Sequence, residues 1–201
     1  MKKILTEKQA DALREVVTIG AGNAATALSQ MIKRKSMIAV PRVDMVKIGD
    51  APKIFGGPER LITSVYLQIL GDITGVLLFS FSKEEAIKLS DLLLDKPAGK
   101  TKLLGEMAQS AIKETMAILA GAYLSAMSKV FNMRLLISSP SLASDMAGAI
   151  IDNILIETSK DADHVIIVDT EFEIRDEKVQ AFFCFVPDVS SMQKLLKALH
   201  I

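Results

Sequence analysis

The sequence predicts an α+β fold in which a largely antiparallel sheet packs against long helices. Sliding the chain by 99 residues places Asp11–Pro41 over Ser110–Pro140 without a gap, which indicates an internal duplication. Each copy opens with a long apolar helix pattern, and the strand patterns that follow come in neighbouring runs rather than alternating with helices. We therefore expect one domain over residues 1–201, made of two internal repeats at about 7–96 and 104–201 that pack around a pseudo-two-fold axis.

The identical positions of the two copies lie both on the helix and on the segment after it. Two halves that each expose one apolar face can pack together and share a core, which makes the duplication a prediction about architecture. The identical pairs are Ala12/Ala111, Glu15/Glu114, Ile19/Ile118, Ala21/Ala120, Gly22/Gly121, Ala27/Ala126, Ser29/Ser128, Ile38/Ile137 and Pro41/Pro140.

The first half opens with a helix pattern that is apolar around most of its circumference, from Leu13 through Ile19 to Ile32, and we expect it to be mostly buried. Small residues at Ala21-Gly22 are expected to let another backbone approach closely. The helix is predicted to end near Lys33-Arg34-Lys35, where cations suit the negative end of the helix dipole. The later elements are expected as strands at Ser36–Val40, Val43–Ile48, Leu61–Leu70 and Val76–Phe81, a loop at Asp50–Arg60, a hairpin turn at Gly71–Gly75, and a helix from about Lys83 to Leu94 after the N-cap Ser82.

The second half repeats the helix pattern from Ile112 through Ile118 to Val130, with small residues at Ala120-Gly121. The polar stretch Lys96–Lys100 separates the halves. The following elements are expected as strands at Arg134–Ser138, Ile154–Glu157, Val165–Ile174 and Val179–Val186, and a helix at Val189–Leu199 after Pro187-Asp188.

Composition excludes several classes of protein. Apolar residues make up 50% of the 201 residues, so global disorder is excluded. Lys plus Arg and Asp plus Glu each number 24, and this balance argues against a dedicated nucleic-acid binder, which needs a basic surplus. The one cysteine, Cys184, lies in an apolar run and is interpreted as a small buried residue on a strand. His164 and His200 carry no catalytic or metal-binding signature, and we expect no metal site.

The start of the chain, Met1–Lys8, is charged and lacks the apolar core of a signal peptide. The longest uncharged stretch, Val16–Ile32, is interrupted by polar residues and is interpreted as a buried helix rather than a membrane span. We expect a cytoplasmic protein without a membrane or nucleic-acid partner.

A polar stripe recurs on the two long helices. Its members are spaced four, three and four residues apart, so they share one helix face. A carboxylate near a helix start commonly satisfies first-turn amide groups, but its recurrence at one register indicates shared function or shared packing. The stripe consists of Asp11, Glu15, Thr18 and Gly22 in the first copy and of Ser110, Glu114, Ala117 and Gly121 in the second.

This stripe carries a resemblance to a known family. Asp or Ser, three residues, Glu, two residues, Asn, twenty-two residues and Pro is the signature of the CheC/CheX/FliY family, chemotaxis phosphatases that act on the phosphorylated response regulator CheY. The chain resembles the CheC members most, over essentially its whole length. The matching segments are Glu15–Ala27, Gly71–Gly75, and Ser144–Met146 after Pro140.

The resemblance implies a CheC-like fold and roles for named residues. In the family the Asn orients the attacking water in the receiver's site and the Glu bridges to the receiver's Lys, so Glu15 and Glu114 take the second role. The response regulator supplies Mg²⁺, so no cofactor of its own is expected. The other positions of the signature are implied to contact the receiver; they are Asp11, Pro41, Ser110 and Pro140. Asp145 stands where the family has an acidic contact to the deamidase CheD.

The chain departs from the family at both asparagine positions, which hold Thr18 and Ala117. An Asn side chain offers a donor and an acceptor on a two-carbon reach, whereas Thr offers a hydroxyl on a shorter, branched stem and Ala offers nothing. The second site is therefore expected to be inactive and the first to be weak or inactive. Asn23 lies about 140° around the helix from Thr18 and does not share the stripe.

Three functions stay open. The first is a module that docks on a CheY-like receiver or on CheD with weak or lost phosphatase activity, and the sequence favours it. The second is an active aspartyl-phosphate phosphatase that uses Glu15 and Thr18. The third is a scaffold or oligomer without enzymatic activity. For Asp145, a turn or a helix cap is as compatible with the sequence as a contact with CheD.

Overall fold

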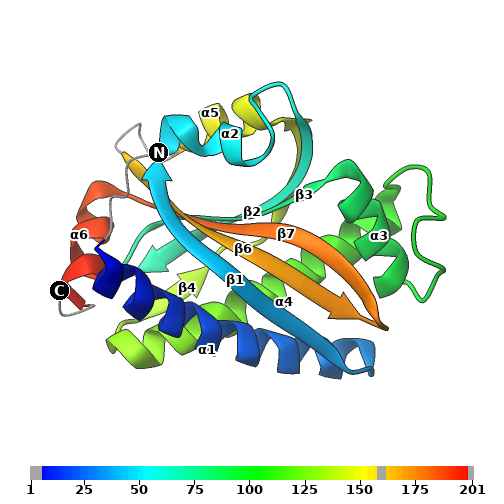
Figure 1. Cartoon of the computed structure of the whole chain (residues 1–201), viewed down its shortest axis with the longest axis horizontal. Helices are drawn as coiled ribbons and strands as arrows, with labels where there is room; N and C mark the ends of the chain where they lie inside the picture. Colours follow the sequence, from blue (N-terminus) through cyan, green and yellow to red (C-terminus); the bar gives the residue numbers. More distant parts are fainter. Residues whose placement is uncertain (1–5, 158–161, 199–201) are drawn as a thin grey trace.

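The structure, a computed structural model of the chain, describes residues 6–157 and 162–198 (Figure 1). The helices are α1 (Glu7–Ile32), α2 (Ala51–Ile54), α3 (Lys83–Leu93), α4 (Glu106–Phe131), α5 (Ala147–Glu157) and α6 (Val189–Ala198), with a 3-10 turn η1 (Ile48–Asp50) before α2. The strands are β1 (Ser36–Lys47), β2 (Leu61–Gly71), β3 (Gly75–Ser82), β4 (Leu135–Ile137), β5 (Ser141–Met146), β6 (His164–Ile174) and β7 (Glu177–Pro187).

The strands of the described residues form one sheet in the order β1-β6-β7-β3-β2-β4, and β5 also pairs with β2. Every pairing is antiparallel. In Figure 1 α1 and α4 cross one face of the sheet, α2 and α5 cover the other, and α3 and α6 lie at opposite ends. The predicted α+β fold with a largely antiparallel sheet is confirmed.

The two halves of the chain contain corresponding elements that exchange strands. β1 of the first half pairs with β6 of the second, and β2 of the first half pairs with β4 and β5 of the second. The central pair, β3 with β7, joins the halves. The long helices α1 and α4 each span 26 residues, and their C-caps Lys33 and Asn132 both adopt the left-handed conformation. These features accord with the predicted repeats, whose origin by duplication stays a prediction.

Two hydrophobic cores lie on the two faces of the sheet. The larger one is formed with α1, α3 and α4, and the smaller one with α2 and α5. The strands β1, β2, β3, β6 and β7 contribute to both cores, because alternate side chains of a strand point to opposite faces of the sheet and both faces are covered. The ring of Tyr123 in α4 stacks on that of Phe183 in β7 at 4.7 Å between centroids, which fixes α4 against the sheet.

The helices α1 and α4 pack against each other in opposite directions. Tyr123 contacts the middle of α1 at Gly20, while Thr115, earlier in α4, donates to the sulfur of Met31 near the end of α1 at 3.9 Å. A Cβ atom at Gly20 would lie 2.5 Å from Cδ1 of Tyr123. Of the small residues predicted to allow a close approach, Ala21 and Ala120 are buried, whereas a Cβ at Gly22 or Gly121 would meet no atom within 4 Å outside its own helix turn. The glycine at the helix contact is Gly20.

The strands predicted at Ser36–Val40 and Val43–Ile48 are one strand, β1. Its register with β6 shifts between Ala39 and Arg42. Pro41 lies in this irregularity, because proline has no N–H to donate to the ladder and is tolerated at the edge of a sheet or in a bulge.

Other expectations differ from the structure. The predicted strand Ile154–Glu157 is the last part of α5, because Ala147, Ile150, Ile151 and Ile154 bury one helix face against the sheet and this packing overrides local β-propensity. The loop predicted at Asp50–Arg60 contains the short helix α2. The strand β5 was not predicted, since its side chains are mostly exposed and give little alternation. The hairpin turn at Gly71–Gly75 and the Ser82 cap are confirmed; Leu199 lies outside the described residues.

Candidate functional site

The start of α1 is fixed by a capping box, which sets the position of the polar stripe along the helix. The hydroxyl of Thr6 accepts from the Gln9 amide at 3.3 Å, and the Gln9 side chain accepts from the Thr6 amide at 2.9 Å. Asp11, Glu15 and Thr18 follow within the next three turns, and all three are exposed. Asp11 forms an exposed ion pair with Arg14 at 3.9 Å.

The rotation of α1 is set by its buried face. Leu13, Val16 and Val17 are buried in the core, so the stripe on the opposite side points away from the sheet. Ile19 was predicted to belong to the buried face, but its residue surface is 45% exposed. The exposed surface of α1 therefore presents an apolar side chain directly beside Thr18.

The second copy of the stripe lies on α4 and is only partly equivalent. Ser110 and Glu114 are exposed, as their counterparts on α1 are. Ala117 and Gly121 are half-buried, and Ala117 packs against the larger core. The position that corresponds to Thr18 thus has neither a polar group nor full exposure. Val130, expected to be buried, is exposed near the end of α4.

Apart from Asp11, the functional polar groups of the stripe are free of intramolecular partners in the described chain. Among the described residues, Glu15, Glu114 and Thr18 form no side-chain hydrogen bond or ion pair. Threonine within a helix commonly donates to the carbonyl one turn earlier, and Thr115 does so to Ala111 at 2.7 Å. The two carboxylates and the hydroxyl of Thr18 are therefore available to a docking partner.

The prolines of the two copies occupy related positions after the long helices. Pro41 is exposed in β1, and Pro140 lies between β4 and β5. From Thr18 to the end of α1 the chain rises about 21 Å, and from Ser36 to Pro41 an extended chain returns about 16 Å. In Figure 1 β1 runs back from the end of α1 at an angle to the helix, so the chain reverses direction between Thr18 and Pro41.

Asp145 lies in β5, just before α5, and not in a turn. Its carboxylate is exposed and accepts from the amide of Met146 at 2.7 Å. It lines a groove of about 350 Å³ with apolar residues of three segments, among them Leu61, Ile87 and Leu103. The stripe residues are not among those that line this groove, but Gln109, which directly precedes Ser110, is.

The groups that bear on metal or thiol chemistry are few. Cys184 is buried as predicted, and burial together with the charge of Asp169 raises the pKa of its thiol. Within residues 6–157 and 162–198, no three His, Cys, Asp or Glu side chains gather in a way that would hold a metal ion. His200 lies outside the described residues. No helix of the described chain has the length and apolar character needed to cross a membrane.

Comparison with known proteins places this architecture in a family. The model of the CheC-like family matches residues 9–44, which hold most of α1 and β1 and the first copy of the stripe. The CheY-P phosphatase CheC of Bacillus subtilis is 35% identical over 199 residues, covering 97% of this chain and 95% of that protein. The chain belongs to the CheC family. The resemblance found in the sequence is thereby confirmed.

Two further relatives agree with the CheC assignment. The flagellar motor switch phosphatase FliY of B. subtilis is 32% identical over 140 residues, which cover 68% of this chain and 35% of FliY. The crystal structure of Thermotoga maritima FliY superposes with a TM-score of 0.77 at 21% identity, covering 98% of both chains, and shows that the fold is shared.

Sequence reasoning missed two residues that shape this CheC-family surface. Gly20 allows the ring of Tyr123 to pack against α1, and it has no identical counterpart in the second copy. Ile19 was included in the apolar helix pattern. It is identical to Ile118 in the second copy, whereas most residues of the pattern differ between the two copies. Ile19 and Gly20 are the two residues after Thr18.

Proposed function

We propose that this CheC-family protein docks on a CheY-type response regulator, on CheD, or on both, with weak or lost phosphatase activity. One observation carries the proposal: Glu15 and Glu114 are exposed and unpaired at one register of α1 and α4, while the asparagine positions hold Thr18 and Ala117. The B. subtilis relative, named CheY-P phosphatase CheC, supports a receiver as the partner. The proposal retains the cytoplasmic location expected from the sequence.

The receiver would bring most of the chemistry. In hydrolysis of an aspartyl phosphate, a water oxygen attacks phosphorus and the bond from phosphorus to the aspartate oxygen breaks. The receiver's aspartate carboxylate is restored, and inorganic phosphate is released. The receiver supplies Mg²⁺ and its Lys, so a phosphatase adds an aligned water and stabilisation of charge. Glu15 or Glu114 would bridge to the receiver's Lys and hold the two proteins in register.

The asparagine positions limit catalysis in this proposal. The hydroxyl of Thr18 is exposed and free, but it stands on a shorter stem than an Asn amide and reaches a water only if the receiver approaches more closely. The half-buried methyl group of Ala117 orients nothing. Loss of a water-positioning group reduces the rate on the order of a hundredfold.

An active phosphatase that uses Glu15 and Thr18 is the second candidate. The specific observation in its favour is the Thr18 hydroxyl, which lacks an intramolecular partner in the described chain, unlike the hydroxyl of Thr115. The exposed Ile19 beside it supplies apolar surface through which a receiver can be held close.

CheD docking rests on the groove beside Asp145. Asp145 is exposed at the rim of an apolar groove, and a carboxylate beside apolar side chains suits a protein interface with a basic counterpart. Replacement of Asp145 by Lys is expected to abolish binding of CheD and to leave receiver binding unchanged.

The decisive experiment mixes the full chain with a phosphorylated CheY-type receiver and measures binding and phosphate release separately. Saturable binding with unchanged phosphate decay supports the docking proposal, and Glu15→Ala should then weaken binding. Accelerated decay that Glu15→Ala removes and Glu114→Ala leaves intact supports the active phosphatase. Absence of binding to both the receiver and CheD rejects both candidates and leaves the scaffold interpretation.

A further inference from the structure

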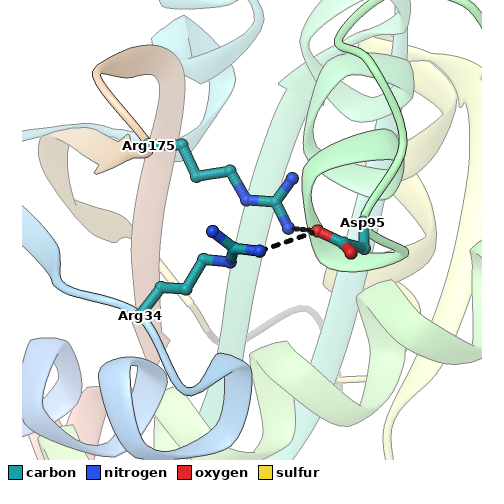
Figure 2. A network of polar contacts seen from close by, with 3 residues as sticks. All are labelled: Arg34, Asp95 and Arg175. Carbon is teal, nitrogen blue, oxygen red and sulfur yellow. Dashed lines mark hydrogen bonds and ion pairs between the residues drawn. The ribbon is translucent and has the colours of Figure 1, made fainter.

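Two arginines converge on one carboxylate at the end of the molecule where α1 ends. Arg34 follows α1, Arg175 lies in the turn between β6 and β7, and Asp95 follows α3. Figure 2 shows both guanidinium groups directed toward the same carboxylate. Nη2 of Arg34 lies 3.4 Å from Oδ1 of Asp95, and Nη2 of Arg175 donates to that same oxygen.

The donors of this cluster exceed its acceptors. Each guanidinium carries five N–H groups in a fixed fork, and the two arginines share a single carboxylate oxygen. Nε of Arg175 is buried and has no acceptor among the described residues. Buried donors of this kind are normally paired, so Nε–H of Arg175 lacks the acceptor that such a group usually has.

The backbone at two of these residues adopts a conformation that side chains seldom take. Arg175 has φ of 55° and Asp95 has φ of 60°, in the left-handed region that favours glycine or asparagine. The turns themselves account for both conformations: Arg175 and Asp176, which has φ of 61°, are the two central residues of the hairpin turn between Ile174 and Glu177, and Asp95 closes the end of α3. These turns fix the points from which the two side chains start.

A cavity of about 490 Å³ opens beside the arginines, which is large enough for a small phosphorylated compound. Lys35 adds a third cation to its lining, and the side chain of Met37 adds an apolar wall. Glu173 and Asp176 also line the cavity, so binding of an anion there depends on the geometry of the guanidinium forks rather than on a general positive charge.

We infer that Arg34 and Arg175 form a binding site for the phosphate group of a small ligand, and that Asp95 occupies the arginines when the site is empty. A phosphate oxygen pair matches the fork of a guanidinium as a carboxylate does, and it carries more negative charge and more acceptors than Asp95. The buried Nε–H of Arg175 would then gain an acceptor.

The arginine site uses different residues from the stripe that is proposed to meet the receiver. Arg34 lies two residues beyond the end of α1, which is about 21 Å along the helix axis from Thr18, although Thr115, which follows Glu114 of the second copy, contacts Met31 near that end. Neither arginine belongs to the polar stripe, so failure of receiver binding and failure of phosphate binding are separate results.

The test is calorimetric titration of the full chain with inorganic pyrophosphate, with chloride at matched ionic strength as the reference. The wild-type protein is expected to bind pyrophosphate saturably. Arg34→Gln and Arg175→Asn should each weaken binding about tenfold or more, since charge-assisted hydrogen bonds are lost. Asparagine tolerates the left-handed backbone at position 175, so the turn is retained.

The sharper arm is Asp95→Asn, which removes the internal competitor and is expected to tighten pyrophosphate binding several-fold. Asp44→Asn is the matched control, because Asp44 pairs with Arg42 at 2.6 Å in a cluster where one arginine meets two carboxylates. Circular dichroism of every variant verifies folding. Lack of saturable binding to the wild-type chain, or an Asp95→Asn variant that binds no more tightly than wild type, overturns the inference.

Discussion

At the scale of single residues, the chemistry of the candidate site depends on Thr18 and Ala117. On both helices the neighbouring glutamate is exposed and unpaired. The glutamates of the signature are therefore retained, while the amide that would orient the water is absent. The structure adds that the two positions differ, because Thr18 is exposed and Ala117 packs against the core. An amide can therefore be restored more readily on α1 than on α4.

Replacement of Thr18 by Asn is expected to raise the rate of receiver dephosphorylation about ten- to a hundredfold, because the amide supplies the donor and acceptor that align the water. Phosphate release from a phosphorylated receiver measures the effect. Ala117→Asn is the matched control and should give a smaller gain, since its side chain starts from a half-buried position. Unchanged release by Thr18→Asn, despite intact binding, would contradict the assigned role of this position.

Gly20 determines how closely α1 and α4 approach. Gly20→Ala places a Cβ 2.5 Å from the ring of Tyr123, which is held by its stacking on Phe183, and overpacking of this kind costs about 1–3 kcal/mol in the free energy of unfolding.

Gly22→Ala is the control for this change. No atom lies within 4 Å of its new Cβ, and the better helix propensity of alanine should stabilise the protein by about 0.5–1 kcal/mol. Urea unfolding of both variants measures the difference. Equal stabilities would refute the packing argument.

At the scale of elements, the connection between α3 and α4 is held by Asp91, which is 0% exposed in α3. Its Oδ2 accepts from the amides of Lys100 at 2.8 Å and Thr101 at 3.0 Å, and its Oδ1 accepts from the Thr101 hydroxyl. This carboxylate thereby ties the segment that joins the two halves back onto α3.

Asp91→Asn is expected to destabilise the protein by about 1–3 kcal/mol at neutral pH, because an amide leaves one of these donors without an acceptor. Burial alone raises the pKa of Asp91, but the hydrogen bonds from Thr101 and Lys100 outweigh it and hold the pKa below its ordinary value of 3.8.

The direction of that shift fixes the dependence on pH. The stabilisation is fully present above pH 3.8 and is lost as the pH falls through the lower value of the folded state. The difference in unfolding free energy between wild type and Asp91→Asn should therefore shrink in acid, as urea titrations at pH 7 and near pH 3 would show. A difference that stayed constant would show that the carboxylate charge is not involved.

Two corners between a long helix and the next strand are built alike. The hydroxyl of Ser29 contacts that of Ser36 at 2.9 Å, and the hydroxyl of Ser128 donates to the carbonyl of Met133 at 2.5 Å. Ser29 and Ser128 are identical in the repeat, so the shared position of this pair has a structural explanation. No comparable intramolecular contact within the described residues accounts for Glu15 and Glu114.

At the scale of the whole molecule, the exchange of strands couples the halves. β1 pairs with β6, and β2 pairs with β4 and β5. Each half on its own would therefore have strands without their pairing partners. The α1–α4 contact and the central β3–β7 pair add interfaces that neither half can bury alone.

Residues 1–99 and residues 100–201, produced separately, are therefore expected not to fold, since unpaired strands and a half-exposed core cannot offset the loss of conformational entropy. Circular dichroism with urea titration of each fragment checks this, and the intact chain should unfold in one cooperative transition. A cooperative transition in either isolated fragment would contradict the coupling.

The sequence was sufficient to predict the elements that interactions between neighbouring residues determine. The Ser82 cap, the turn at Gly71–Gly75 and the 26-residue helices that begin 99 residues apart all follow from capping groups, turn residues and apolar spacing. Ile154 shows the limit: its β-branched neighbourhood resembles a strand, and only burial of one helix face against the sheet decides that it is helical.

The sequence by itself determined the fold class, the family resemblance and the residues of the polar stripe, because periodicity and spacing are properties of the chain alone. The tertiary structure decided which strands pair across the halves, that Gly20 rather than Gly22 lies at the helix contact, and that Arg34, Asp95 and Arg175 meet. These features join segments that are up to 141 residues apart, and such contacts depend on packing of the whole chain, which local patterns do not encode.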